Sequence, residues 1–530
     1  MKALSSKGKF LSLLLGLSFV FTGCSTANKQ KHQELQKYVR EGKFDKGLAL
    51  VQSKDFYAEE NSKLLKLLEL GMMHYYNANY YQALKSFDAA KELSDKLFTV
   101  SISKKITAAV SNDNEDNYYG EKYERSLIRL YQVFSHLALN DAAKYEAYSV
   151  EEMGADKKPV VKLVPEKSLS EKERRFHLVA ARAVLLEWNS ILDSYKATSG
   201  GKPTYKDDMM AKVFGAFVHE RLGSSNDLQI AKGLYVEAKK ILLKNFSIYK
   251  TYNLKNEDFI KEYSKLHLMN EKDVKAKFLK ESDYYNTLNK YLDQRIANLK
   301  RKKKDNVYFM ISHGFIASKE AKKIDFPLPV ATIPSGISDK GGFIGFSGKV
   351  LNAAAGTIPK IYFELPSIPY RPVTTKLFTV VKDEAGKVIS KDETALVDPL
   401  SEIAYHTLDE QSISNMAKVG ARVAGKHLAA LGAAYLIYEK QKGSLGEFGA
   451  MMLASGSYSA ANKGIEYSEK ADLRFWATLP SDYRLNSISL PPGKYTVAVV
   501  AEVPGGENLL SQKSFVIEKG KTKLVSLIAL

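Results

Sequence analysis

The pattern of apolar residues changes near residue 305, and this change limits the possible folds more than any other feature. From Asn28 to Lys304, apolar residues recur at spacings of three and four and proline is nearly absent, which predicts helices. After Asn306, short apolar runs alternate with proline and glycine, which predicts strands joined by turns. We therefore expect an α+β multidomain protein, with a helical region at 24–304 and β-rich segments at 305–393 and 471–530.

One stretch of the helical region resembles a tetratricopeptide repeat, in which small residues bring two antiparallel helices together and large residues wedge between neighbouring pairs. Its characteristic positions are Gly71, Tyr80, Ala83, Phe87 and Ala90. Weaker copies lie upstream at 42–49 and downstream at Ala231, Tyr235 and Ala238. Because one repeat cannot bury its own apolar face, we expect a short solenoid whose concave surface binds a protein partner. The alternative is an irregular helical bundle that uses no groove.

Three polar stretches punctuate or end this region. Gly154 to Leu169 and Ala197 to Asp207 contain proline and glycine between periodic segments, and we expect loops between repeats. The basic run from Lys300 to Lys304 suits a solvated last helical turn followed by a linker. The alternative for this run is a contact with phosphates or anionic lipid headgroups.

The two β-rich segments are expected to form one antiparallel sandwich, interrupted at 394–470 by a helical hairpin. The turn is predicted at Gln441 to Gly443. Small residues spaced by three and four should line one face of each helix and pack against each other; they are Ala421, Gly425, Ala429 and Gly432, then Gly446, Ala450, Ala454, Ser457 and Ala461. Such stripes also pack helices in membranes. Leu428 to Tyr438 covers only about half a membrane span, so soluble packing is favoured.

The N-terminus has the pattern of a lipoprotein signal peptide. Three lysines precede an apolar run from Phe10 to Phe21, and Thr22 and Gly23 precede Cys24, the only cysteine of the chain. We expect residues 1–23 to be removed and Cys24 to carry a covalent lipid, which leaves no thiol for a disulfide. Ser25 favours sorting to the outer membrane. The alternative is an ordinary secretory signal with an incidental cysteine.

Charge indicates the class of partner. The chain has a formal charge of +18, and subtracting the three lysines of the predicted signal leaves +15. An exported basic protein faces anionic lipid or peptidoglycan, to which its basic surface could bind. Nucleic acid is not an expected partner, because the envelope compartment excludes it.

No arrangement of residues typical of catalysis or metal binding is found. The sequence contains no H-E-x-x-H motif, and Gly345 to Gly348 lacks the glycine pattern of a nucleophile elbow. Neighbouring carboxylates such as Asp207 and Asp208 would point to different faces of a helix. We therefore expect a protein that is not an enzyme, with no metal and no cofactor apart from the lipid on Cys24.

Arg474 and Trp476 form a candidate contact patch between the helical hairpin and the last strands. On an extended segment they would face the same side, and Asp472 could pair with Arg474 there. One interpretation is a recognition patch on the surface. The favoured interpretation is structural, with this segment locking the hairpin onto the sandwich.

Three stretches together resemble a family of uncharacterised bacterial envelope lipoproteins that join degenerate tetratricopeptide-like repeats to a C-terminal β-rich region. They are Tyr119 to Arg125, Phe363 to Pro366, and Ala471 to Pro480. The resemblance spans most of the mature chain and implies location and architecture. It names no catalytic residue, although members of the family are associated with cell-envelope work, including the regulation of peptidoglycan synthesis.

These features together predict an outer-membrane lipoprotein that faces the periplasm and acts as a protein-binding scaffold or adaptor in envelope assembly or maintenance. A first alternative is a glycan-binding protein or envelope enzyme, with Tyr362, Tyr370 and Trp476 as candidate stacking surfaces. A second is a structural component of a secretion or motility apparatus.

Overall fold

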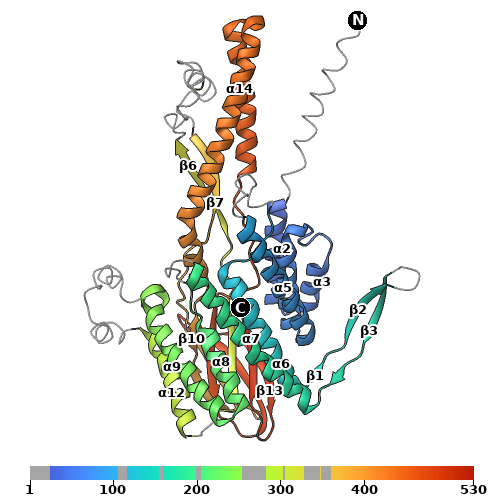
Figure 1. Ribbon diagram of the computed structural model, residues 1–530. Coiled ribbons are helices and arrows are strands. Elements are labelled where there is room, and N and C mark those ends of the chain that lie inside the picture. The colour runs from blue at the N-terminus through green and yellow to red at the C-terminus, as the bar shows by residue number, and fades with distance from the viewer. Residues whose placement is uncertain are drawn as a thin grey trace.

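The computed structural model describes residues 24–104, 116–153, 159–198, 205–253, 282–301, 305–327, 347 and 360–530. The predicted signal peptide at 1–23 lies outside these residues, as do positions 302–304 of the basic run. The protein contains both helices and sheets, as the α+β class requires (Figure 1).

Helices dominate the N-terminal region, and each packs against the next in chain order, with α12 packing on α9. Short 3-10 turns at Glu60–Ser62 and Lys250–Asn253 accompany them. The helices are α2 (Cys24–Arg40), α3 (Phe44–Gln52), α4 (Lys63–Tyr76), α5 (Tyr80–Lys104), α6 (Lys122–Ala142), α7 (Glu171–Thr198), α8 (Met209–Leu222), α9 (Ser225–Ile248) and α12 (Asp283–Arg301).

Local signals explain several helix boundaries. Capping boxes begin α6, with Glu121 and Glu124, and α9, with Ser224 and Asp227, because each pair satisfies backbone N–H groups that the first turn leaves unbonded. Gly223 ends α8 at φ +78°, a left-handed conformation that glycine adopts without a Cβ clash. These boundaries set the turn between α8 and α9.

The loop predicted at Gly154 to Leu169 is wrong, because much of this segment forms strands. β2 (Tyr148–Met153) pairs antiparallel with β3 (Pro159–Val164), and β1 (Lys144–Tyr145) pairs with β4 (Lys167–Ser168) at the base. This two-stranded ribbon projects from the helices (Figure 1). Pro159 and Pro165 suggested a loop, but they bracket a run rich in valine and leucine, and proline is tolerated at the first residue of a strand.

Two four-stranded sheets are each built from strands on both sides of the helical insert. The first has the order β10-β11-β5-β14, from β10 (Ala395–Asp398), β11 (Asp482–Ile488), β5 (Val307–His313) and β14 (Lys523–Ala529). The second has the order β13-β12-β8-β9, from β13 (Gly506–Ile517), β12 (Gly493–Val503), β8 (Leu377–Asp383) and β9 (Val388–Glu393). All of these pairs are antiparallel except β14 with β5, which is parallel. Side chains from both sheets share one apolar core, in which Phe309 meets Phe515.

A long helical hairpin, α14 (Leu400–Ser468), projects away from the sheets (Figure 1). The chain reverses at Gly446, with φ +70°, and not at the predicted turn at Gln441 to Gly443. Arg422 Nη2 donates to Glu469 Oε2 at 2.7 Å and His427 Nδ1 lies 2.9 Å from the Tyr458 hydroxyl, so the two arms are antiparallel. The helix starts at Leu400, because residues 395–398 of the predicted insert form β10. A ribbon of β6 (Glu320–Pro327) and β7 (Lys360–Ser367) packs against the hairpin.

The predicted packing of small residues is wrong for the first arm. Ala421, Gly425 and Ala429 are exposed, and a Cβ atom added at Gly425 or Gly432 would meet nothing within 4 Å. The arms share a core made of larger side chains, with Ala454 as the one small residue of the second arm in it; its members on the arms are Val419, Val423, Leu431, Ala434, Ala454, Tyr458 and Ile465. Burying the larger side chains removes more apolar surface from water, so they and not the alanine and glycine stripe face inward on the first arm.

The largest core continues from the helical region into the C-terminal half. Leu68, Tyr131 and Phe214 from the helices belong to the same buried cluster as Leu396, Trp476 and Tyr483. The helical region and the β-rich segments that the sequence separates therefore share one hydrophobic core.

Candidate functional site

The tetratricopeptide-like positions lie inside pairs of helices. A Cβ atom at Gly71 on α4 would come within 2.6 Å of Cε1 of Phe87 on α5, so glycine permits this close approach. Ala83, Phe87 and Ala90 are fully buried, whereas Tyr80 is half-buried beside Tyr75. In the weaker copy, Ala231, Tyr235 and Ala238 on α9 are also fully buried.

The chain's own segment 471–480 packs against α2, α4 and α6, and we name the surface of these helices that it contacts the inner surface. The backbone N–H of Trp476 donates to Glu124 Oε1 on α6 at 2.8 Å, and that of Ala477 donates to Glu69 Oε1 on α4 at 2.7 Å. The Thr478 hydroxyl also donates to Glu69. In the other direction, the Ala477 carbonyl accepts from Gln36 on α2, at 2.7 Å. Three helices therefore bind the main chain of one segment, which turns at Ala477 and Thr478.

Trp476 is 0% exposed and cannot be a surface contact patch. Its ring lies 6.0 Å from Phe87 and 5.6 Å from Tyr131, centroid to centroid. Burial also removes Trp476 as a stacking surface for glycan. Of the other two candidates, Tyr370 donates its hydroxyl to Glu402, while Tyr362 is exposed on β7.

Arg474 binds the segment to the backbone just ahead of α4 and α6. Its guanidinium donates to both carboxylate oxygens of Asp472, at 2.9 and 2.8 Å, as the predicted pairing of these two residues requires. It also donates to the carbonyls of Asn61, at 3.2 Å, and Asp116, at 3.0 Å. These hydrogen bonds join the segment to the helical region, a contact that the favoured structural interpretation did not include.

Burial controls the charge of the carboxylates at this junction. It raises the pKa of Glu69 to about 8, although the hydrogen bonds from Thr478 and Ala477 act in the opposite direction. Burial also raises the pKa of Glu124. The sequence did not identify either residue as a binding group, because the residues around a carboxylate on a helix do not show which distant segment will contact it. The only signal was that Glu124 and Trp476 each lie in a stretch that carries the family resemblance.

A second carboxylate pair joins elements far apart in sequence. Asp208 accepts from the backbone N–H of Ala211 at the start of α8, and Asp398 ends β10. Burial raises the pKa of Asp208 to about 6, and burial followed by repulsion from Asp208 raises that of Asp398. Each is 3% exposed, so a substrate in solution does not reach them and they serve the packing of α8 on β10. Within the described ranges, no group of His, Cys, Asp and Glu side chains is suited to hold a metal ion.

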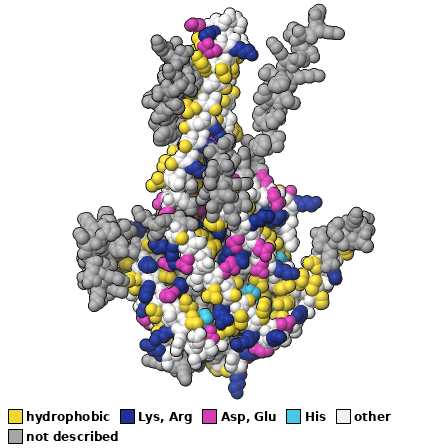
Figure 2. Space-filling view, viewed as in Figure 1, with side chains coloured by type: hydrophobic (Ala, Val, Ile, Leu, Met, Phe, Trp, Pro, Cys, Tyr) yellow, Lys and Arg dark blue, Asp and Glu magenta, His cyan; other side chains and the backbone are white. Residues whose placement is uncertain are grey.

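Two projections carry exposed apolar side chains (Figure 2). The first is the ribbon β2–β3, where Val161 and Leu163 are 69% and 68% exposed. The base of the ribbon contacts α7, because the Tyr145 hydroxyl lies within hydrogen-bond distance, 3.0 Å, of His177. Two large apolar residues of α7, Phe176 and Leu186, are also exposed. We name this surface, made of residues 160–163 and the exposed face of α7, the ribbon surface.

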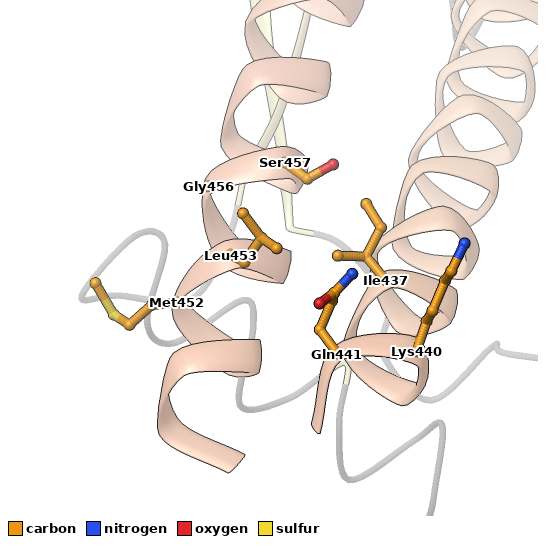
Figure 3. Close-up of a pocket in the computed structure, with 7 residues that line it drawn as sticks. All are labelled: Ile437, Lys440, Gln441, Met452, Leu453, Gly456 and Ser457. Atoms are coloured by element: carbon orange, nitrogen blue, oxygen red, sulfur yellow. The ribbon is translucent and has the colours of Figure 1, made fainter. Parts of the chain in front are cut away.

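The second projection is the distal end of α14. A groove of about 520 Å³ lies between the two arms, and Ile437 and Leu453 point into it from opposite sides (Figure 3). Met452 and Gly456 of the second arm also line the groove (Figure 3). Of the helices that the structure describes, none is both long enough and apolar enough to cross a bilayer.

No family model, no curated protein and no solved structure matches the chain.

Proposed function

We propose that the chain is an outer-membrane lipoprotein, anchored through lipid on Cys24 and facing the periplasm, that acts as a protein-binding scaffold in envelope assembly or maintenance. In this proposal the helices form a short tetratricopeptide-like solenoid and the two four-stranded sheets form a sandwich. No catalytic step is assigned to it. The ribbon surface carries the proposal, because it leaves large apolar side chains in water next to helices whose inner surface is already filled.

Occupation of the inner surface moves the proposed contact to the outside of the helical region. The hydrogen bonds from Trp476 and Ala477 use the carboxylates that would otherwise receive a partner's main chain. On the ribbon, by contrast, the neighbouring residues Val160 and Val161 are both exposed. Because successive residues of a strand point to opposite faces, the ribbon is apolar on both faces. Contiguous exposed apolar surface of this kind marks a protein interaction site.

The chemistry of the ribbon surface indicates the kind of partner. A two-stranded ribbon has unpaired backbone groups along its outer edges, and an extended segment of another protein can add to such an edge as a further strand. Lys172 and Arg175 on α7 are exposed among the apolar residues. The partner we propose therefore presents an extended segment that is apolar and acidic.

The test is crosslinking in cells with Val161→Glu and Leu163→Glu. Both side chains are exposed, so the substitutions should leave the fold intact while they repel an apolar, acidic segment. We expect at least about a tenfold loss of crosslinked partner, which corresponds to about 1.4 kcal/mol. Val388→Glu is the matched control, since Val388 is also an exposed valine on a strand. Equal crosslinking in all three variants would refute the ribbon surface as the binding site.

A further inference from the structure

We propose that α14 binds a second copy of this chain, by antiparallel pairing of the two hairpins through the outer face of the second arm, residues 447–468. This inference concerns a different surface from the ribbon surface and does not depend on it. It begins from exposed residues on the second arm that do not belong to the core shared by the two arms.

The outer face of the second arm has large apolar residues near the tip and small residues toward the base. Phe448 and Met452 are 81% and 59% exposed. Gly456, Ala460 and Gly464 follow at spacings of four and are exposed too. Each step of four residues advances about 40° around a helix, so these five positions form one ridge that winds across the outer face, which we name the stripe. No charged residue lies between Phe448 and Asn462.

The glycines of this stripe have no packing role within the chain. A Cβ atom added at Gly456 or at Gly464 would meet nothing within 4 Å. Glycine inside a helix lowers stability relative to alanine, and the hairpin keeps it where its own fold does not need the space. A glycine on an exposed helix face lets another helix approach closely.

The stripe is complementary to itself when two copies run antiparallel. A two-fold axis at the level of Ala454 places Met452 of one copy against Gly456 of the other. The same register places Phe448 at the level of Ala460, so a small residue lies at the level of each large one. A two-fold axis repeats every contact, which makes the interface isologous and closed. It also brings the tip of one hairpin, where Glu447 is exposed, beside the base of the other, where Lys463 is exposed.

Charges at the tip favour a protein partner over lipid. Glu439, Lys440, Lys442 and Glu447 surround the turn, and Lys442 pairs with Glu439 at 2.6 Å. Insertion of the tip into a bilayer would move all four of these side chains out of water, which is costly. In the antiparallel pair they stay in solvent beside residues of both signs, Lys463 and Glu466.

The first measurement is the mass of the full chain in solution, with Cys24→Ser so that no lipid is attached. We expect a dimer whose Kd rises at least about tenfold in Phe448→Glu and in Met452→Glu. Ile413→Glu is the matched control, because Ile413 is 76% exposed on the first arm, away from the stripe, and should leave the Kd unchanged. Circular dichroism of each variant checks that the helices are retained. A monomer at every concentration measured overturns the proposal.

The second measurement tests the register with single cysteines in the same Cys24→Ser chain and a short bis-maleimide linker. Gly456→Cys lies near the axis and should link to itself. Two Phe448→Cys residues would be offset by about 18 Å along the helices, at 1.5 Å per residue, and should not link, whereas Phe448→Cys mixed with Ala460→Cys should. Self-linking of Phe448→Cys would show parallel pairing and overturn the proposal. So would a monomer that floats with phospholipid vesicles only when Phe448 is intact.

Discussion

Glu69 shows how one buried side chain makes the fold depend on pH. Burial raises its pKa from the ordinary value of 4.5 to about 8, so between these values the folded protein keeps a proton that the unfolded chain has lost. The stability contributed by this proton is complete below pH 4.5 and is lost as pH rises through about 8. Glu69→Gln keeps an acceptor for the Ala477 N–H and places an amide NH2 that can donate to the Thr478 hydroxyl. We expect this variant to reduce the slope with which the free energy of unfolding falls as pH rises, by up to about 1.4 kcal/mol per pH unit.

Chemical denaturation at a series of pH values measures this slope. Glu92→Gln is the control, since Glu92 is exposed on α5 and its removal should leave the slope unchanged. A slope that is the same in Glu69→Gln and in the unaltered chain would contradict the assignment of the proton to Glu69. The sequence could place Trp476 beside Arg474, but it could not give Glu69 as the acceptor for Ala477 because the two lie on elements about 400 residues apart.

At the scale of elements, the same substitution should have opposite effects on two helices. Gly71→Ala places a Cβ against the buried ring of Phe87, and the overpacking should cost about 1–3 kcal/mol. Gly233→Ala on α9 meets nothing within 4 Å and should stabilise the helix by about 0.5–1 kcal/mol. Thermal melts of the full chain compare the two, and a stabilised Gly71→Ala would show that α4 and α5 do not need the glycine.

Helices and strands were predictable where the spacing of apolar residues was regular. Which face of each helix is buried was not predictable. The period of three and four marks α4 to α6 and both arms of α14, and alternation with turns marks β5, β8 and β12. The direction in which a stripe points depends on which neighbour buries more apolar surface, so Ala421 and Gly425 are exposed although their spacing is regular. The ribbon β2–β3 could not be predicted, because Pro159 and Pro165 favour a loop.

For the whole molecule, the proposed anchor on Cys24 makes location depend on one residue. If lipid on this thiol is the main attachment, Cys24→Ser should move the processed protein from the membrane fraction to the soluble fraction. The measurement is fractionation with a check of the mature mass, and Ser25→Ala, which keeps the cysteine, serves as the control. A processed but unlipidated protein that stays with the membrane would be attached by another route, such as its basic surface.

The position of the docked segment has a consequence for how the protein is made. Residues 471–480 follow the helical region by more than 150 residues, yet Trp476 packs against the rings of Phe87 and Tyr131, which belong to the first helices. During synthesis from the N-terminus, the apolar surface of α4 to α6 that Trp476 covers therefore stays uncovered until residues 471–480 have been made. Final folding is a late event, and a chain interrupted before residue 471 lacks the piece that closes its own first half.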